Sequence, residues 1–168
     1  MQVWDAAGGD PIRFDADALA RSELGWIVEH GLLVDVLWRA LRRSSVRLRC
    51  PARVEAMEQD DAGVRLRLDD GTRVAAKIAI AADGAASRLR VLAGIEVDAH
   101  DYAQQGVVAY VRTEHPHEDT AWQRFLPTGP LALLPWVDGS CSIVWTLPSD
   151  EAARVLALDD AGFGREIT

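Results

Sequence analysis

The stretch from residue 78 to residue 90, which reads I-A-I-A-A-D-G-A-A-S-R-L-R, constrains the fold more than any other part of the chain. An apolar run rich in Ile and Ala ends at Asp83 and Gly84, and a polar segment compatible with a helix follows. A buried strand that turns into a helix has this pattern. We therefore expect a strand-to-helix turn here, with the helix beginning near Ala85 or Ala86.

Turns of this kind can bind phosphates and sugars. Gly84 removes the side chain where a ligand must approach the backbone, and the first amides of the helix would point at that ligand. Asp83 can accept hydrogen bonds from ribose or ribityl hydroxyls, and Arg90 could either reach a phosphate or anchor Asp83. The alternative is an ordinary tight turn, in which Ser87 and Arg90 are simply solvated.

The composition indicates a globular protein without a nucleic-acid partner. A chain of 168 residues that is 49% hydrophobic can bury a core, as one domain or as two small interlocked parts. The net charge is -8 and the basic residues are scattered, which argues against nucleic acid. The apolar runs are too short to span a bilayer, and no basic region followed by an apolar stretch opens the chain. We expect a cytoplasmic protein, with at most peripheral contact with the inner membrane.

The sequence offers no metal site and no catalytic constellation. Cys50 and Cys141 lie far apart without a C-x-x-C motif, so both are expected to be buried, reduced thiols. His115 and His117 have no acidic or Cys partner at a suitable spacing for a metal. Ser87 lacks the G-x-S-x-G context of a nucleophile. We therefore assign no catalytic residue and no metal ligand.

Alternating and helical patterns predict an α+β fold. An amphipathic helix is expected over residues 29–43, and a further helix is expected from residue 149, capped by Ser149 or Asp150. The remaining segments read as a hairpin, a small antiparallel meander and a larger antiparallel sheet. The expected strands cover residues 2–5, 11–14, 46–49, 53–58, 64–68, 73–82, 102–113, 120–126, 129–136 and 141–147.

Several segments resemble one family. The spacing D-G-x-x-S-x-x-R, filled by Asp83, Gly84, Ser87 and Arg90, resembles the second fingerprint of the flavin-dependent aromatic hydroxylases, where it touches FAD and the nicotinamide coenzyme. Further segments are similar, in the same order and spacing, to the ubiquinone-biosynthesis hydroxylases of the 2-octaprenyl phenol and benzoquinol type. These segments are residues 25–33, 102–105, 123–127, 129–135 and 142–146.

The resemblance implies a fold like that of p-hydroxybenzoate hydroxylase. Residues 25–95 would form the later part of the FAD-binding domain, with the long helix packed beside the meander. Residues 1–24 and 96–158 would form the substrate-domain sheet, and residues 159–168 would begin a following helix. Glu29 would lie near the flavin, although His30-Gly31 stands where close relatives have an Asn-Arg pair.

The resemblance also implies a reaction. Such proteins use FAD, NAD(P)H and O2 to hydroxylate a polyprenylated phenol or quinol through a flavin hydroperoxide. The protein must align ring and flavin and exclude water, so an apolar pocket matters more than an acid or a base. Candidate wall residues lie in the predicted sheet, where the alternative is that they are sheet core. They are Trp122, Phe125, Leu133, Pro135 and Trp145.

The sequence departs from the family pattern in one large respect. It has neither a G-x-G-x-x-G turn for the FAD pyrophosphate nor a G-D-A-A-H-like segment. The glycine pair nearest the start of the sequence, Gly8-Gly9, is predicted to lie in a hairpin turn instead. The chain therefore reads as the central part of a hydroxylase. Two alternatives remain open. One is a non-catalytic module that binds an apolar aromatic molecule or a partner chain. The other is a truncated, inactive product whose exposed apolar surface causes dimerisation or aggregation.

Overall fold

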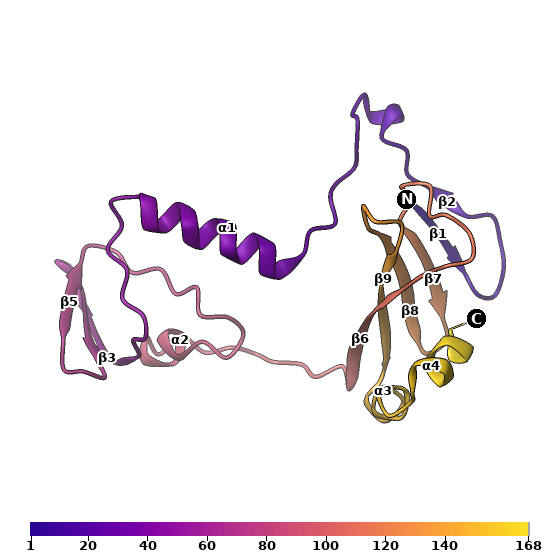
Figure 1. Cartoon of the computed structure of the whole chain (residues 1–168). Coiled ribbons are helices and arrows are strands. Elements are labelled where there is room, and N and C mark those ends of the chain that lie inside the picture. Colours follow the sequence, from indigo (N-terminus) through magenta and orange to yellow (C-terminus); the bar gives the residue numbers. More distant parts are fainter. Residues whose placement is uncertain (168) are drawn as a thin grey trace. The chain divides into compact units, whose positions relative to one another are not determined.

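The computed structural model describes residues 1–167, and contacts within it divide the chain into two compact units. Met1–His30 and Asp101–Thr168 form unit 1, and Gly31–His100 forms unit 2. The sequence places the corresponding boundaries near residues 25 and 95. Figure 1 shows the elements of both units, each of which is described by itself below.

Unit 1 is built on a six-stranded sheet in the order β2-β1-β7-β8-β9-β6. Its neighbouring strands are antiparallel except for β1 and β7, which run parallel. The sheet is therefore mixed, whereas the sequence predicts an antiparallel one, and the predicted α+β class is confirmed. The strands are β1 (Gln2–Asp5), β2 (Ile12–Arg13), β6 (Gln104–Val111), β7 (Trp122–Leu126), β8 (Gly129–Pro135) and β9 (Cys141–Pro148).

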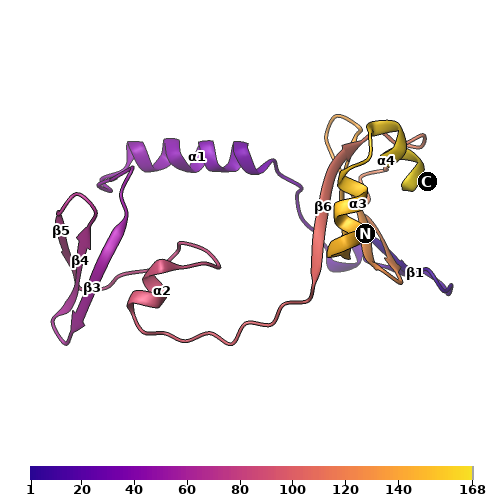
Figure 2. The same cartoon turned by 90° about the horizontal axis from the view of Figure 1, so that it is seen from below.

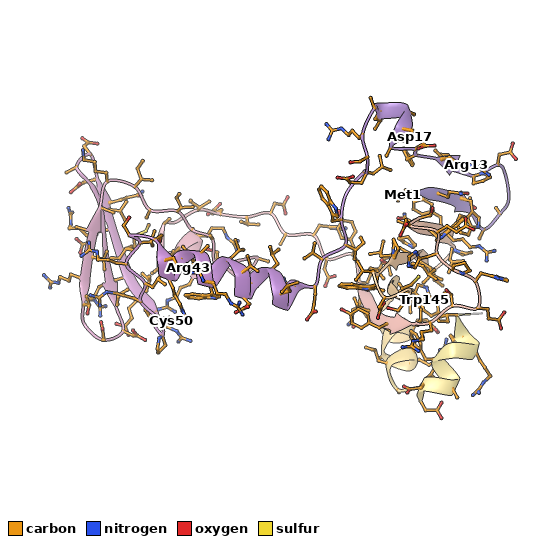
Figure 3. The ribbon with its side chains drawn as sticks, turned by 45° about the horizontal axis from the view of Figure 1, so that its top comes forward. Met1, Arg13, Asp17, Arg43, Cys50 and Trp145 are labelled. Carbon is orange, nitrogen blue, oxygen red and sulfur yellow. The ribbon has the colours of Figure 1, made fainter. Side chains whose placement is uncertain are left out.

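The core of unit 1 lies on one face of this sheet, under the helices α3 (Ser149–Leu156) and α4 (Asp160–Glu166) (Figure 2). Alternate residues of β9 point to this face, as the two-residue period of a strand requires. Ile143, Trp145 and Leu147 are buried there against Ala152 and Val155 of α3. Figure 3 shows Trp145 among the side chains of this sheet.

The two helices begin in different ways. Asp159 caps α4, because its carboxylate accepts a hydrogen bond of 2.7 Å from the backbone N–H of Gly162. The N-cap of α3 is Pro148, and no side chain caps it. The prediction that Ser149 or Asp150 is the cap is therefore wrong, because β9 continues to Pro148 and leads directly into the helix. The short helical turn η1 (Asp17–Leu19) follows β2 in the chain and belongs to unit 1.

Unit 2 contains an antiparallel meander, a long helix and a short one. The meander consists of β3 (Val54–Asp60), β4 (Gly63–Leu68) and β5 (Arg73–Ala76), in that order. The helices are α1 (His30–Arg43) and α2 (Arg88–Leu92). The predicted meander and long helix are therefore present.

Two predicted strand segments of unit 2 are not strands. Residues 46–49 have no regular structure, and the strand predicted over residues 73–82 ends at Ala76. Beyond Ala76 the apolar run is exposed, with Ile78 77% and Ile80 85% accessible. A buried strand needs a hydrogen-bonding neighbour. Ala76, the last residue of β5, pairs with Val64, and β4 begins only one residue before Val64, at Gly63. The run is apolar, but the prediction that it is a buried strand is wrong.

The long helix and Cys50 also differ from expectation. No residue of α1 is buried, so the helix does not pack its apolar side against the meander as predicted. Cys50 is exposed, whereas Cys141 is buried in β9. The prediction of two buried thiols is therefore wrong for Cys50, because the segment that precedes β3 is not a strand and covers no core.

Candidate functional site

Asp83 organises the turn at the centre of the D-G-x-x-S-x-x-R motif. Its Oδ1 accepts a hydrogen bond of 2.5 Å from the Ser87 hydroxyl, and its Oδ2 accepts one of 3.2 Å from the backbone N–H of Leu89. Ser87 is buried and is the N-cap of α2, with its Oγ accepting from the backbone N–H of Arg90 at 3.0 Å. Asp83 and Ser87 thus form a connected network that fixes the start of α2.

This network changes the acidity of Asp83. The hydroxyl of Ser87 is the main cause that lowers the pKa of the Asp83 carboxyl below its ordinary value, and the backbone N–H of Leu89 adds to the effect. Hydrogen bonds to the charged form favour ionisation. Asp83 is therefore an exposed, anionic acceptor at neutral pH.

The turn before α2 differs from the predicted helix start. The helix begins at Arg88 rather than near Ala85 or Ala86, because Ser87 caps it. Ala85 and Ala86 form a turn closed by a hydrogen bond of 3.1 Å from the N–H of Ser87 to the carbonyl of Gly84. Gly84 has φ of 83°, a left-handed conformation that favours glycine, with open space around the position of a Cβ.

The residues of this turn fit part of a nucleotide cofactor. Asp83 is exposed, and its oxygens retain acceptor capacity beyond the two hydrogen bonds they already accept. Within residues 1–167, no hydrogen bond occupies the backbone N–H of Ala85 or Ala86, and both residues are exposed. An exposed carboxylate beside free amide donors matches a group that carries both hydroxyls and phosphates.

The side chains of Arg90 and Glu29 do not join this network. In the part of the chain that the structure describes, Arg90 forms no ion pair with Asp83, whose partners are Ser87 and Leu89 instead. Glu29 is exposed and directly precedes α1. It belongs to unit 1, whereas Asp83 belongs to unit 2. The predicted roles of Arg90 and Glu29 towards FAD stay predictions.

The five predicted pocket residues lie on two different faces of the six-stranded sheet. Trp122, Leu133 and Pro135 lie on the helix-covered face, together with Trp145. The register shows this, because Trp122 pairs with Leu133, and Pro135 pairs with Cys141 of β9. Trp145 is only 7% exposed, and Trp4 contacts Trp122 edge-to-face at 6.3 Å. Phe125 lies on the opposite face, paired with Pro130.

The face opposite the helices is a further candidate wall. We call it the open face, and its residues in β6, β7, β8 and β9 carry no charged side chain. Tyr110 and Val108 are 65% and 60% exposed there, and the rings of Tyr110 and Trp136 lie 5.6 Å apart. The open face consists of Gln104, Gly106, Val108, Tyr110, Gln123, Phe125, Pro130, Ala132, Leu134, Ser142, Val144, Thr146 and Pro148. Such a surface suits an uncharged aromatic ring.

His117 holds the loop beside this face. Its Nδ1 accepts a hydrogen bond of 3.0 Å from the backbone N–H of Asp119, so its Nε2 carries the proton and donates to the carbonyl of Trp136 at 2.9 Å. The carbonyl of His117 accepts from the indole N–H of Trp122 at 3.3 Å. Among the described residues, no group of His, Cys, Asp and Glu side chains could hold a metal. His117 has a structural role that the sequence analysis missed.

The fold is that of FAD-dependent monooxygenases. A crystal structure titled pqsL, a probable FAD-dependent monooxygenase from Pseudomonas aeruginosa, matches 99% of this chain with a TM-score of 0.70 at 20% identity, over 46% of that chain. P. aeruginosa PqsL in complex with 2-aminobenzoylacetate matches 81% of this chain with a TM-score of 0.64, over 38% of that chain. These likenesses establish the shared architecture.

Sequence comparison identifies the family. The model of the FAD binding domain matches residues 9–156, and the chain belongs to this family. It is 39% identical to the 3-demethoxyubiquinol 3-hydroxylase of Escherichia coli over 95% of this chain. It is 36% identical to the human ubiquinone biosynthesis monooxygenase COQ6 over 97% of this chain. The chain spans 40% and 37% of the lengths of these two relatives.

None of the described helices is both long and apolar enough to cross a membrane.

Proposed function

We propose that this chain is part of a flavin-dependent monooxygenase that hydroxylates the ring of a polyprenyl phenol or quinol. The relatives named above support the reaction class, since their names describe hydroxylation and ubiquinone biosynthesis. The observation that carries the proposal is the open face, which offers exposed aromatic and aliphatic side chains without a charge. An electron-rich, uncharged ring is the substrate chemistry that this surface matches.

The residues that would hold FAD are those of the turn before α2. Asp83 would accept hydrogen bonds from cofactor hydroxyls, while the free N–H groups of Ala85 and Ala86 would donate to oxygen atoms of the cofactor. Ser87 would act indirectly, by fixing the Asp83 carboxylate through their 2.5 Å hydrogen bond. When bound and reduced by NAD(P)H, FAD supplies the activation of O2.

The open face would position the substrate ring and keep water away from it. Tyr110 on β6 and Phe125 on β7 offer exposed aromatic surfaces, and the apolar side chains of Ala132 on β8 and Val144 on β9 lie between them. Rings stack or meet edge-to-face on such surfaces, and burial of apolar area supplies the binding free energy. No side chain on this face is required as an acid or a base, because the cofactor supplies the chemistry.

Localisation and partners form a second part of the proposal. An apolar prenylated substrate partitions into bilayers, so we propose a cytoplasmic protein that touches the inner membrane peripherally. We also propose that the isolated chain forms a homodimer. The exposed apolar residues of α1 support this, because such patches favour association. They are Leu32, Leu33, Val36, Leu37, Trp38 and Leu41.

Product analysis tests the proposed reaction. The isolated chain, which has no G-x-G-x-x-G turn, is expected to be inactive. A protein in which this chain is joined to the remaining parts of the monooxygenase is therefore incubated with FAD, NAD(P)H, O2 labelled with heavy oxygen, and a prenylated phenol. The proposal predicts a product that carries one labelled oxygen on the ring, and a Phe125→Ala, Tyr110→Ala variant should form less of it. FAD binding by that protein without any labelled product would contradict the hydroxylase function and favour a binding module.

A further inference from the structure

One hydrogen bond ties the start of α2 to the meander. The Nε–H of Arg88 donates to the carbonyl of Val54, the first residue of β3, at 2.7 Å. The two residues are 34 positions apart in the sequence, and both belong to unit 2. Within residues 1–167, no other hydrogen bond joins residues 83–94 to the three strands of the meander. Arg88 is therefore the polar anchor of α2 on the meander.

The acceptor of this hydrogen bond is held in place by the sheet. Val54 pairs with Leu68 of β4, which is only 5% exposed. The register then shifts between Val54 and Ala56, so the ladder between β3 and β4 is locally interrupted. At this irregularity the carbonyl of Val54 takes its hydrogen bond from the Arg88 side chain. The anchor thus fills an acceptor position on a fixed part of unit 2.

The donor lies between the two residues that hold Asp83. The hydroxyl of Ser87 donates to Oδ1 of Asp83 at 2.5 Å, and the backbone N–H of Leu89 donates to its Oδ2 at 3.2 Å. Ser87 and Leu89 are the chain neighbours of Arg88, so a movement of Arg88 moves both hydrogen-bond donors. The bond to Val54 therefore fixes the Asp83 carboxylate relative to the meander.

Apolar packing contributes little to the position of this turn. Among residues 31–100, which form unit 2, only Leu68 and Ser87 are buried. No residue of α2 is buried, and residues 77–82, which lead into the turn, are exposed. A hydrogen bond from a charged donor is stronger than one between neutral groups. With so little core around the turn, loss of this one bond should have a measurable effect.

We propose that Arg88 is a positioning residue, which holds the Asp83 carboxylate where FAD would meet it. The inference rests on the proposed function, because it concerns the turn that would hold the cofactor. Arg88 lies outside the D-G-x-x-S-x-x-R spacing, whose arginine is Arg90. Within residues 1–167 the Arg88 guanidinium forms no ion pair. Attraction of an anionic cofactor by its charge is therefore the competing explanation, and the experiment has to separate the two.

Two substitutions of Arg88 separate the hydrogen bond from the charge. Arg88→Gln removes the charge but places an amide nitrogen at the position of Nε, whereas Arg88→Met keeps the side-chain length and removes both charge and donor. Titration of flavin fluorescence with the purified chain measures the affinity for FAD. We expect Arg88→Met to weaken FAD binding about fivefold and Arg88→Gln to stay within about twofold of wild type. Arg43→Met is the matched control and should not weaken binding. Arg43 lies in unit 2, and its side chain forms no hydrogen bond or ion pair within residues 1–167.

Amide hydrogen exchange, followed by NMR, gives a second readout that does not require FAD. The N–H of Leu89, which donates to Asp83, should exchange about fivefold faster in Arg88→Met and at nearly the wild-type rate in Arg88→Gln. The amides of β4, the central strand of the meander, should keep their wild-type rates in both variants. Faster exchange throughout β4 would show that Arg88 maintains the fold of the unit rather than the turn, and would overturn the positioning role.

The outcomes of the titration distinguish this inference from the proposed function. Equal losses of FAD affinity in Arg88→Gln and Arg88→Met would assign the effect to charge and overturn the positioning role. Wild-type affinity in Arg88→Met, with weaker binding in Asp83→Ala, would overturn the positioning role and leave the cofactor site in place. Absence of FAD binding by the wild-type chain, or an affinity that Asp83→Ala leaves unchanged, would contradict the cofactor site and the positioning role together.

Discussion

Replacement of Ser87 by Ala should loosen the start of α2 and change the acidity of Asp83. The variant removes the 3.0 Å hydrogen bond that the N–H of Arg90 donates to Ser87 Oγ, and the 2.5 Å bond from that hydroxyl to Asp83. Loss of an N-cap serine costs about 1 kcal/mol. Hydrogen exchange of the Arg90 amide, followed by NMR, should therefore become about fivefold faster.

The pH dependence of the same site has a defined sign. The pKa of Asp83 is lowered in the folded chain, so its contribution to stability is present above the unfolded pKa and is lost as pH falls through the folded pKa. In Ser87→Ala the main cause of the lowering is gone. The pKa of Asp83, measured from its side-chain carbon resonance, should rise towards that of an ordinary aspartate.

Ser44→Ala is the matched control for this prediction. The Ser44 hydroxyl donates to the carbonyl of Leu41 at 2.7 Å in the same unit, but it caps no helix start. This variant should leave both the Arg90 exchange rate and the pKa of Asp83 unchanged. Unchanged values in Ser87→Ala would refute the inference that Ser87 organises the turn.

Three further predictions concern packing, backbone conformation and association. Val155→Ala should lower the free energy of unfolding of unit 1 by about 2 kcal/mol, because Val155 is 1% exposed. Urea unfolding followed by Trp fluorescence measures this change. The control Leu156→Ala, at a 63% exposed site, should change the free energy of unfolding by under about 0.5 kcal/mol. Gly129→Ala should cost more than Gly139→Ala in the same assay. Both have positive φ, but at Gly129 a Cβ would approach a carbonyl oxygen of β9, and at Gly139 it would meet open space. Val36→Lys on α1 should lower self-association in sedimentation velocity, and an unchanged sedimentation coefficient in a dimerising sample would argue against contact through α1.

The sequence predicts most elements of this fold because their patterns are local. The meander is predicted by the alternation of apolar and polar residues, and the long helix by apolar residues that recur with the helical period. The D-G turn at residues 70–71 joins two strands of the meander that pair with each other. The run over residues 77–82 is different. An apolar segment forms a buried strand only where a neighbouring strand pairs with it. The residues of the run do not show whether such a neighbour is present, and here residues 77–82 are exposed and form no strand.

The same limit applies to the candidate site. The motif residues Asp83 and Ser87 are brought together because they are four residues apart at a helix start. The predicted pocket residues are apolar members of neighbouring strands, but the face on which each side chain lies depends on the register of those strands. The alternation within β9 gives a usable signal, since Ser142 and Thr146 mark the open face and place Trp145 on the buried face.

Titration of FAD fluorescence tests whether the turn before α2 holds the cofactor. We expect the purified chain to quench flavin fluorescence with micromolar affinity, and Asp83→Ala to weaken binding at least tenfold. Asp138→Ala is the matched control, because Asp138 also accepts hydrogen bonds within a turn, from the N–H and hydroxyl of Ser140, but lies in unit 1 outside the motif. Quenching that is absent, or equal in wild type and Asp83→Ala, would contradict the claim that this turn holds the cofactor.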